Sequence, residues 1–75
     1  MDERINDCYQ DLANAIILQA VHDYRKALKI LKRYPRCKAA LEEKKRDEEF
    51  FQSEWYSHLT KVDGKRLMKK LQEEV

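Results

Sequence analysis

The sequence predicts an all-α protein, and three observations support this prediction. The 75 residues include one glycine and one proline, so the turn-forming residues that a multi-stranded sheet needs are scarce. Apolar residues recur at steps of three and four, which is the spacing of one helix face. Hydrophobic residues make up 43% of the chain, too many for a disordered tail. The length suits a single helical domain over residues 1–75.

A long first helix is predicted from about residue 3 to residue 33. No glycine or proline interrupts this segment, and Pro35 ends it because proline lacks an N–H and restricts the residue before it. Some 30 residues at 1.5 Å each span about 45 Å, which is longer than a compact globule of this size. Such an overhang leaves apolar surface unburied, so we expect a homodimer to complete the helical bundle. The expected dimer interface is the apolar row Ile17, Val21, Tyr24, Leu28 and Leu31.

A second helix is predicted from about residue 37 to residue 58. Its apolar stripe comprises Ala40, Leu41, Phe51, Trp55 and Leu59. Lys44 and Glu48 interrupt this stripe, within a run of eight charged residues from Glu42 to Glu49. Either the helix continues through the run with its middle in solvent, or it breaks there. A continuous helix is favoured because no glycine, proline or asparagine marks a break.

A short third helix is predicted from about residue 64 to residue 74. Asp63 is a suitable N-cap, and Thr60 is an alternative cap one turn earlier. Val62 before the cap would pack on Leu67 at the fourth helical position. The three-helix prediction therefore has one element much longer than the other two.

Charge is segregated along the chain. The net charge is −4 over residues 1–24, +8 over 25–46, −4 over 47–60 and +2 over 61–75. Within the basic segment, one face of the first helix carries a basic stripe that consists of Arg25, Lys26, Lys29, Lys32, Arg33 and Arg36. The stripe suits a nucleic-acid backbone, an acidic protein surface or plain solvent.

Two features of the basic stripe argue against nucleic acid as its partner. No aromatic residue lies within it to stack on bases. The same helix face becomes acidic toward Asp11 and Asp7, as expected of a self-complementary surface in an antiparallel dimer.

The segment from residue 42 to residue 59, which combines charged and aromatic residues, is the expected protein-binding surface. Phe51, Trp55 and Leu59 are predicted to pack against the third helix, whereas Phe50 and Tyr56 point away from them. Tyrosine and tryptophan are favoured interface anchors. The candidate binding residues are Glu42, Glu43, Asp47, Glu48, Glu49, Phe50, Trp55 and Tyr56.

Several function classes are excluded by what the chain lacks. His22 and His58 have no zinc-ligand spacing, so we expect no metal site. One glycine cannot form a phosphate-binding loop, and Ser53 and Ser57 have no nucleophile elbow around them, so we expect no enzyme, cofactor or small-molecule substrate. Cys8 and Cys37 are too far apart along one helix for a disulfide.

The expected location is the cytoplasm. No apolar stretch is long enough to cross a membrane, and the first residues are acidic where a signal peptide is basic. Two cysteines outside any paired motif also fit a reducing compartment.

The C-terminal half resembles a set of small, mostly uncharacterised proteins encoded by phages and prophages of Gram-positive bacteria. The shared pattern is Phe50-Phe51-x-Ser53-x-Trp55-Tyr56-x-x-Leu59-Thr60-x-x-Asp63-Gly64-x-x-Leu67, with Asp23-Tyr24-Arg25-x-Ala27-Leu28 upstream, and together these span roughly residues 23–71. Lys44 departs from the family, which commonly has an apolar residue there. The resemblance implies a viral accessory role inside a bacterial host.

This setting favours a non-enzymatic protein that binds and inhibits or modulates a host protein, of the anti-defence type that includes anti-CRISPR proteins. The alternative is a nucleic-acid-binding accessory factor in phage replication or transcription that uses the basic stripe. A third reading is a structural subunit that binds only itself or another phage protein.

Overall fold

The computed structural model describes the backbone of residues 3–75 and the side chains of residues 10–75. Four helices occur in this part of the chain: α1 (Glu3–Arg33), α2 (Lys38–Phe51), α3 (Glu54–Leu59) and α4 (Gly64–Glu74). No strand is present among the described residues, so the all-α prediction is confirmed. Asp7 and Cys8 lie outside the residues whose side chains are described.

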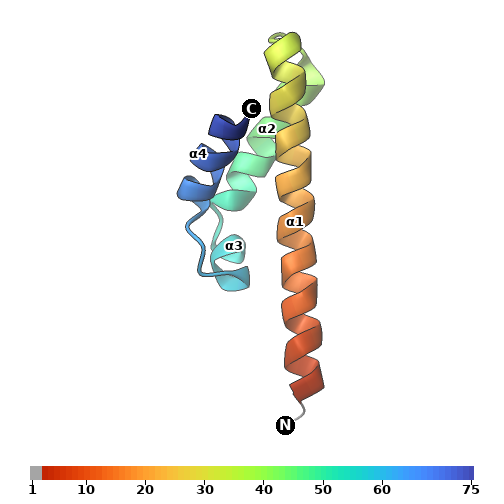
Figure 1. Ribbon diagram of the computed structural model, residues 1–75, viewed down its shortest axis with the longest axis vertical. Helices are drawn as coiled ribbons and strands as arrows, with labels where there is room; N and C mark the ends of the chain where they lie inside the picture. The colour runs from red at the N-terminus through yellow and green to blue at the C-terminus, as the bar shows by residue number, and fades with distance from the viewer. Residues whose placement is uncertain (1–2) are drawn as a thin grey trace.

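Helix α1 runs the whole length of the molecule, which measures 51 × 20 × 18 Å. Its bounds agree with the predicted 3–33. Figure 1 shows α2 and α4 beside its C-terminal half, α3 farther toward its N-terminal end, and no element beside its first turns. The helix therefore overhangs the rest of the chain.

A tight turn joins α1 to α2 where Pro35 was expected to end the first helix. The amide of Tyr34 donates to the carbonyl of Ile30 at 2.7 Å, and the amide of Cys37 donates to Tyr34 at 3.0 Å. Helix α2 then returns along α1 and continues without a break through the charged run. The predicted continuity is therefore confirmed, but the middle of the helix is not all in solvent, because Asp47 is buried. Lys44 and Glu48, both half-buried, form an ion pair at 3.3 Å.

The prediction that this second helix reaches residue 58 is wrong. Helix α2 ends at Phe51, and Ser53 caps a separate helix, α3. The Ser53 hydroxyl donates to the carbonyl of Phe50 at 2.6 Å and accepts from the amide of Tyr56 at 3.1 Å. A serine side chain can replace helical backbone hydrogen bonds in this way, and no glycine or proline is needed. The chain therefore has four helices and not three.

The break after Phe51 changes which aromatic residues face the core. In one continuous helix Phe51 and Trp55 would share a face. In the structure Tyr56 and Leu59 are buried, whereas Trp55 is 56% exposed. The expectation that Trp55 packs inside and Tyr56 points outward is therefore reversed, because the turn at Ser53 rotates α3 relative to α2.

The hydrophobic core gathers side chains from all four helices. It consists of Val21, Tyr24, Phe51, Tyr56, Met68 and Leu71, with Ile17, Ala20, Leu28, Phe50 and Leu67 packed against it. The Phe51 ring meets Tyr24 and Tyr56 edge-on at 5.7 and 5.6 Å. In this edge-on geometry the positive edge of one ring is attracted to the negative face of the other.

The apolar row expected to form a dimer interface is used within the chain. Val21 and Tyr24 are buried, Ile17 and Leu28 pack against the core, and Leu31 is half-buried. Helix α4 folds back onto this side of α1 and supplies Met68 and Leu71 to cover it. A second copy cannot use these residues without displacing α4.

The Tyr24 hydroxyl connects three helices through the core. It donates to Glu48 on α2 at 2.8 Å and accepts from the Gln72 amide on α4, also at 2.8 Å. The ring is fully buried, and this desolvation raises the pKa of Tyr24 to about 12. The hydroxyl stays protonated and continues to donate at physiological pH.

Asp47 is a buried carboxyl on the side of α2 that faces α1. It is 7% exposed, and its Oδ2 atom has no hydrogen-bond partner in the described part of the chain. Burial first, then the side chain of Glu43 and the charge of Asp23, raise the pKa of Asp47 to about 7, while Arg46 acts in the opposite direction. Below about pH 7 the folded chain therefore favours the protonated acid.

This pKa predicts that stability falls as the pH rises. The unfolded carboxyl ionises near pH 4 and the folded one near 7, so the folded state binds more protons between these values. Urea unfolding should show that the free energy of unfolding of Asp47→Asn, relative to that of the wild type, increases by roughly 1–4 kcal/mol between pH 4 and pH 7. Glu42→Gln, the same kind of acid-to-amide change at an exposed position of α2, is the control. If the free energies of unfolding of the wild type and Asp47→Asn change equally with pH, the raised pKa of Asp47 is contradicted.

Gly64 allows the start of α4 to approach the end of α2. It is buried, and a Cβ atom there would lie 1.9 Å from the backbone oxygen of Phe51 and 2.9 Å from its carbonyl carbon. Both are backbone atoms, so no side-chain rotation relieves the overlap. Asp63 caps the helix beside this contact by accepting from the amide of Lys65 at 3.0 Å, which confirms the predicted cap.

Gly64→Ala should therefore destabilise the protein, although alanine is ordinarily the better helix former. Relieving the overlap requires α4 to move off α2, and we expect a loss of about 2 kcal/mol or more in the free energy of unfolding. Lys65→Ala, at the next and exposed position, should change stability little. Thermal unfolding followed by circular dichroism measures both, and equal midpoints for Gly64→Ala and wild type would refute the close approach.

Candidate functional site

The first candidate surface lies at the end of α2, which is shorter than α1 and does not cover the N-terminal part of α1 (Figure 1). Asp23, Ala27 and Ile30 of α1 line a cavity of about 220 Å³ together with Ala40 and Glu43 of α2, so this side of α1 faces α2. At helical spacing the same side continues toward the N-terminus with Ile16 and Leu12. Helix α2 has ended at this level, and Leu12 is 60% exposed.

Two aromatic residues lie near the end of α2, one on α2 and one on α3. Phe50 is half-buried, and its ring meets the exposed ring of Trp55 edge-on at 5.5 Å. Helix α3, which carries Trp55, lies beside the part of α1 that follows its free N-terminal turns (Figure 1). We call Leu12, Ile16, Phe50 and Trp55 the junction patch.

The acidic residues predicted to bind a protein do not form one exposed row. Asp47 is buried, and Glu48 accepts from Tyr24 and pairs with Lys44. Glu43 is half-buried and pairs with Arg46 at 3.4 Å. Of the five predicted carboxylates, Glu42 and Glu49 alone are exposed. Tyr56, the remaining predicted contact residue, lies in the core.

The basic stripe is exposed along its whole length, from Arg25 on α1 to Arg36 in the turn after it. Two of its members connect α1 to the end of α4. Arg25 forms an ion pair with Glu74 at 2.9 Å, and the Lys32 ammonium donates to the main-chain oxygen of Val75 at 2.6 Å. The other four, Lys26, Lys29, Arg33 and Arg36, project from the surface.

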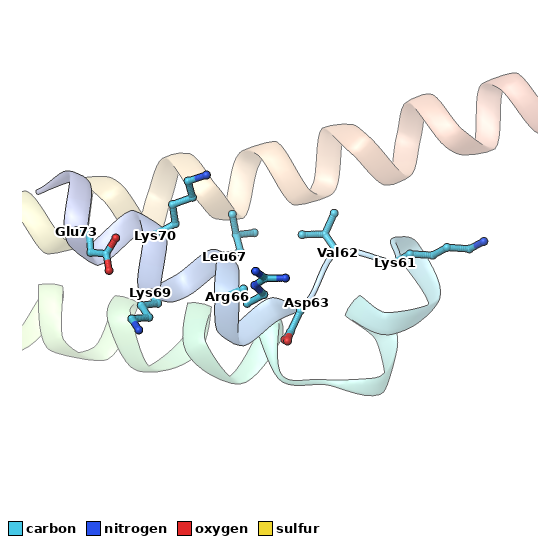
Figure 2. Close-up of a pocket in the computed structure, with 8 residues that line it drawn as sticks. All are labelled: Lys61, Val62, Asp63, Arg66, Leu67, Lys69, Lys70 and Glu73. Carbon is cyan, nitrogen blue, oxygen red and sulfur yellow. The ribbon is translucent and has the colours of Figure 1, made fainter.

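A second basic surface, on α4, was missed by the sequence analysis. A shallow depression is lined by Lys61, Val62, Asp63, Arg66, Leu67, Lys69, Lys70 and Glu73. Figure 2 shows that Lys70 points toward α1, that Lys69 leaves α4 on a different side from Lys70, and that Lys61 extends from the loop before α4. The signal was present in the sequence as five cations between residues 61 and 70, but Asp63, Glu73 and Glu74 reduced the segment's net charge to +2.

The described residues contain no group of three histidine, cysteine or acidic side chains arranged to hold a metal ion. Cys37 is a half-buried free thiol, and His22 and His58 are exposed on different helices. Within residues 3–75 we also find no helix with the length and apolar character that crossing a bilayer requires. The candidate sites in the described part of the chain are therefore its exposed apolar and charged surfaces.

Comparisons with known proteins add no assignment. No protein-family model matches the chain, and no match is found among curated proteins or solved structures.

Proposed function

We propose that this chain is a non-enzymatic protein that binds another protein through the junction patch. The observation that carries the proposal is the exposure of Trp55 and Leu12, at 56% and 60%, around the end of α2. Combined with the resemblance of residues 23–71 to phage and prophage proteins, it supports a viral accessory protein in the cytoplasm of a bacterial host. There it would inhibit or modulate a host protein, as anti-defence proteins do.

The chemistry of the patch suits a protein partner. Tryptophan is the residue most enriched among binding hot spots, because a large ring loses much water-exposed area when a partner covers it. Phe50 supports the Trp55 ring from one side, so the ring is positioned before binding. A positioned anchor loses less conformational entropy on association.

In this proposal the acidic residues between 42 and 49 are secondary to the junction patch. Asp47, Glu43 and Glu48 are buried, paired or hydrogen-bonded within the chain. Glu42 and Glu49 would add polar contacts at the rim, where charges affect specificity and association rate more than affinity.

Trp55→Ala should abolish or strongly weaken capture of the partner. Loss of a hot-spot tryptophan costs about 2 kcal/mol or more, which is roughly a thirtyfold weaker Kd. Tagged wild-type and variant chains would be incubated with nuclease-treated host lysate, and captured proteins identified by mass spectrometry. Tyr34→Ala is the matched control, because Tyr34 is an equally exposed aromatic residue, 64%, at the opposite end of α1. Equal yields from Trp55→Ala and wild type would exclude the junction patch.

A second candidate function, nucleic-acid binding, is favoured by the two basic surfaces. Four cations of the basic stripe project from the surface, and α4 with the loop before it adds Lys61, Arg66, Lys69 and Lys70 around the depression. Cations spaced along two helices can neutralise several phosphates without reading bases.

Neutralising Lys29, Arg33 and Arg36 to glutamine tests this candidate. If these residues contact phosphates, affinity for duplex DNA should fall, and the slope of log K against log salt should drop by about 0.9 for each lost contact. Fluorescence anisotropy at several salt concentrations measures the slope. Lys45→Gln, on α2 and outside both surfaces, serves as control. Absence of DNA binding by the wild type at low salt would eliminate this function.

A further inference from the structure

The face of α1 that carries the basic stripe also carries an acid, a leucine and a base at equal intervals. Asp11, Leu18 and Arg25 are each seven residues apart, which is about two helical turns or 10.5 Å. All three are exposed, and Leu18, at 66%, is the most exposed large apolar side chain among residues 10–75. Leu18 is also the middle residue of Glu3–Arg33, so the face is centred on the helix.

Leu18 lies at the edge of an apolar groove between α1 and α4. The groove has a volume of about 460 Å³, and the side chains that line it include Ile17, Leu18, Val21, Val62, Leu67 and Leu71. Val62, from the loop before α4, is 57% exposed. An apolar groove between helices with exposed leucine and valine is the kind of surface on which another helix packs.

We propose that a second copy of this chain docks antiparallel on this face, with the two Leu18 side chains meeting at the twofold axis. In this register Asp11 of each copy lies opposite Arg25 of its partner, so the interface contains two symmetry-related pairs of opposite charge. A parallel arrangement in the same register would place like charges together. The face is therefore complementary to itself in one orientation, which is what a twofold interface requires.

The shape of the chain supports the same occupant. Helix α4 lies beside the C-terminal half of α1 and leaves the first turns uncovered (Figure 1). An antiparallel copy centred on Leu18 brings its own C-terminal half, with α4, alongside those turns. Each copy thus covers the overhang of the other. Arg25 can serve Asp11 of the partner and Glu74 of its own chain, because a guanidinium has five N–H donors.

This dimer is independent of the proposed function. Leu12 of the junction patch and Leu18 are six residues apart, so they point in directions that differ by about 120° around α1. The dimer also leaves the row Ile17, Val21, Tyr24, Leu28 and Leu31 in its intramolecular packing.

Sedimentation equilibrium of the full chain at low salt tests the proposal. The wild-type mass should rise from 9.1 kDa toward twice that value as concentration increases. Leu18→Arg places two like charges at the axis and should give a monomer at every concentration. Leu12→Arg is the matched control and should associate like the wild type, while it weakens partner capture in the lysate experiment. Circular dichroism checks that both variants fold.

A charge exchange tests the register. Asp11→Arg should weaken association by about tenfold or more, because it converts two exposed ion pairs into like-charge pairs. The double variant Asp11→Arg, Arg25→Asp restores opposite charges and should recover dimerisation. A wild type that remains at 9.1 kDa at all concentrations overturns the proposal, and so does a dimer that survives both Leu18→Arg and Asp11→Arg.

Discussion

The structure depends on the turn that Ser53 makes between α2 and α3. Its hydroxyl satisfies the carbonyl of Phe50 and the amide of Tyr56, so the chain can leave one helix and start another within two residues. Because of that change in direction, Tyr56 enters the core and Trp55 faces outward. The following loop can then bring α4 back onto α1, where Met68 and Leu71 complete the core.

The sequence predicted well the helix that is long and the helix whose start has a clear capping residue. The absence of breakers fixed α1 at Glu3–Arg33, and Asp63 before Gly64 fixed the start of α4. It failed at Ser53, since a serine in a helical pattern carries no signal until its hydroxyl is seen to bond the backbone on both sides. The error in α2 then reversed the predicted environments of Trp55 and Tyr56.

The candidate sites were harder to predict for a related reason. Helical spacing shows which residues share a helix face. It does not show which of several apolar faces another part of the same chain will cover. The row through Val21 and Tyr24 was assigned to a second copy, whereas α4 takes that place. Likewise Asp47 reads as one more surface carboxylate in the sequence, and its burial follows from the pairing of α1 with α2.

The position of Trp55 also gives the protein a built-in optical reporter. It is the only tryptophan in the chain, and its indole ring is largely in water at the junction patch. Its emission therefore comes from one site and carries no background from the core, where the aromatic side chains are tyrosine and phenylalanine. A partner that covers the patch would shift this emission to shorter wavelength, whereas a partner on either basic surface would leave it unchanged.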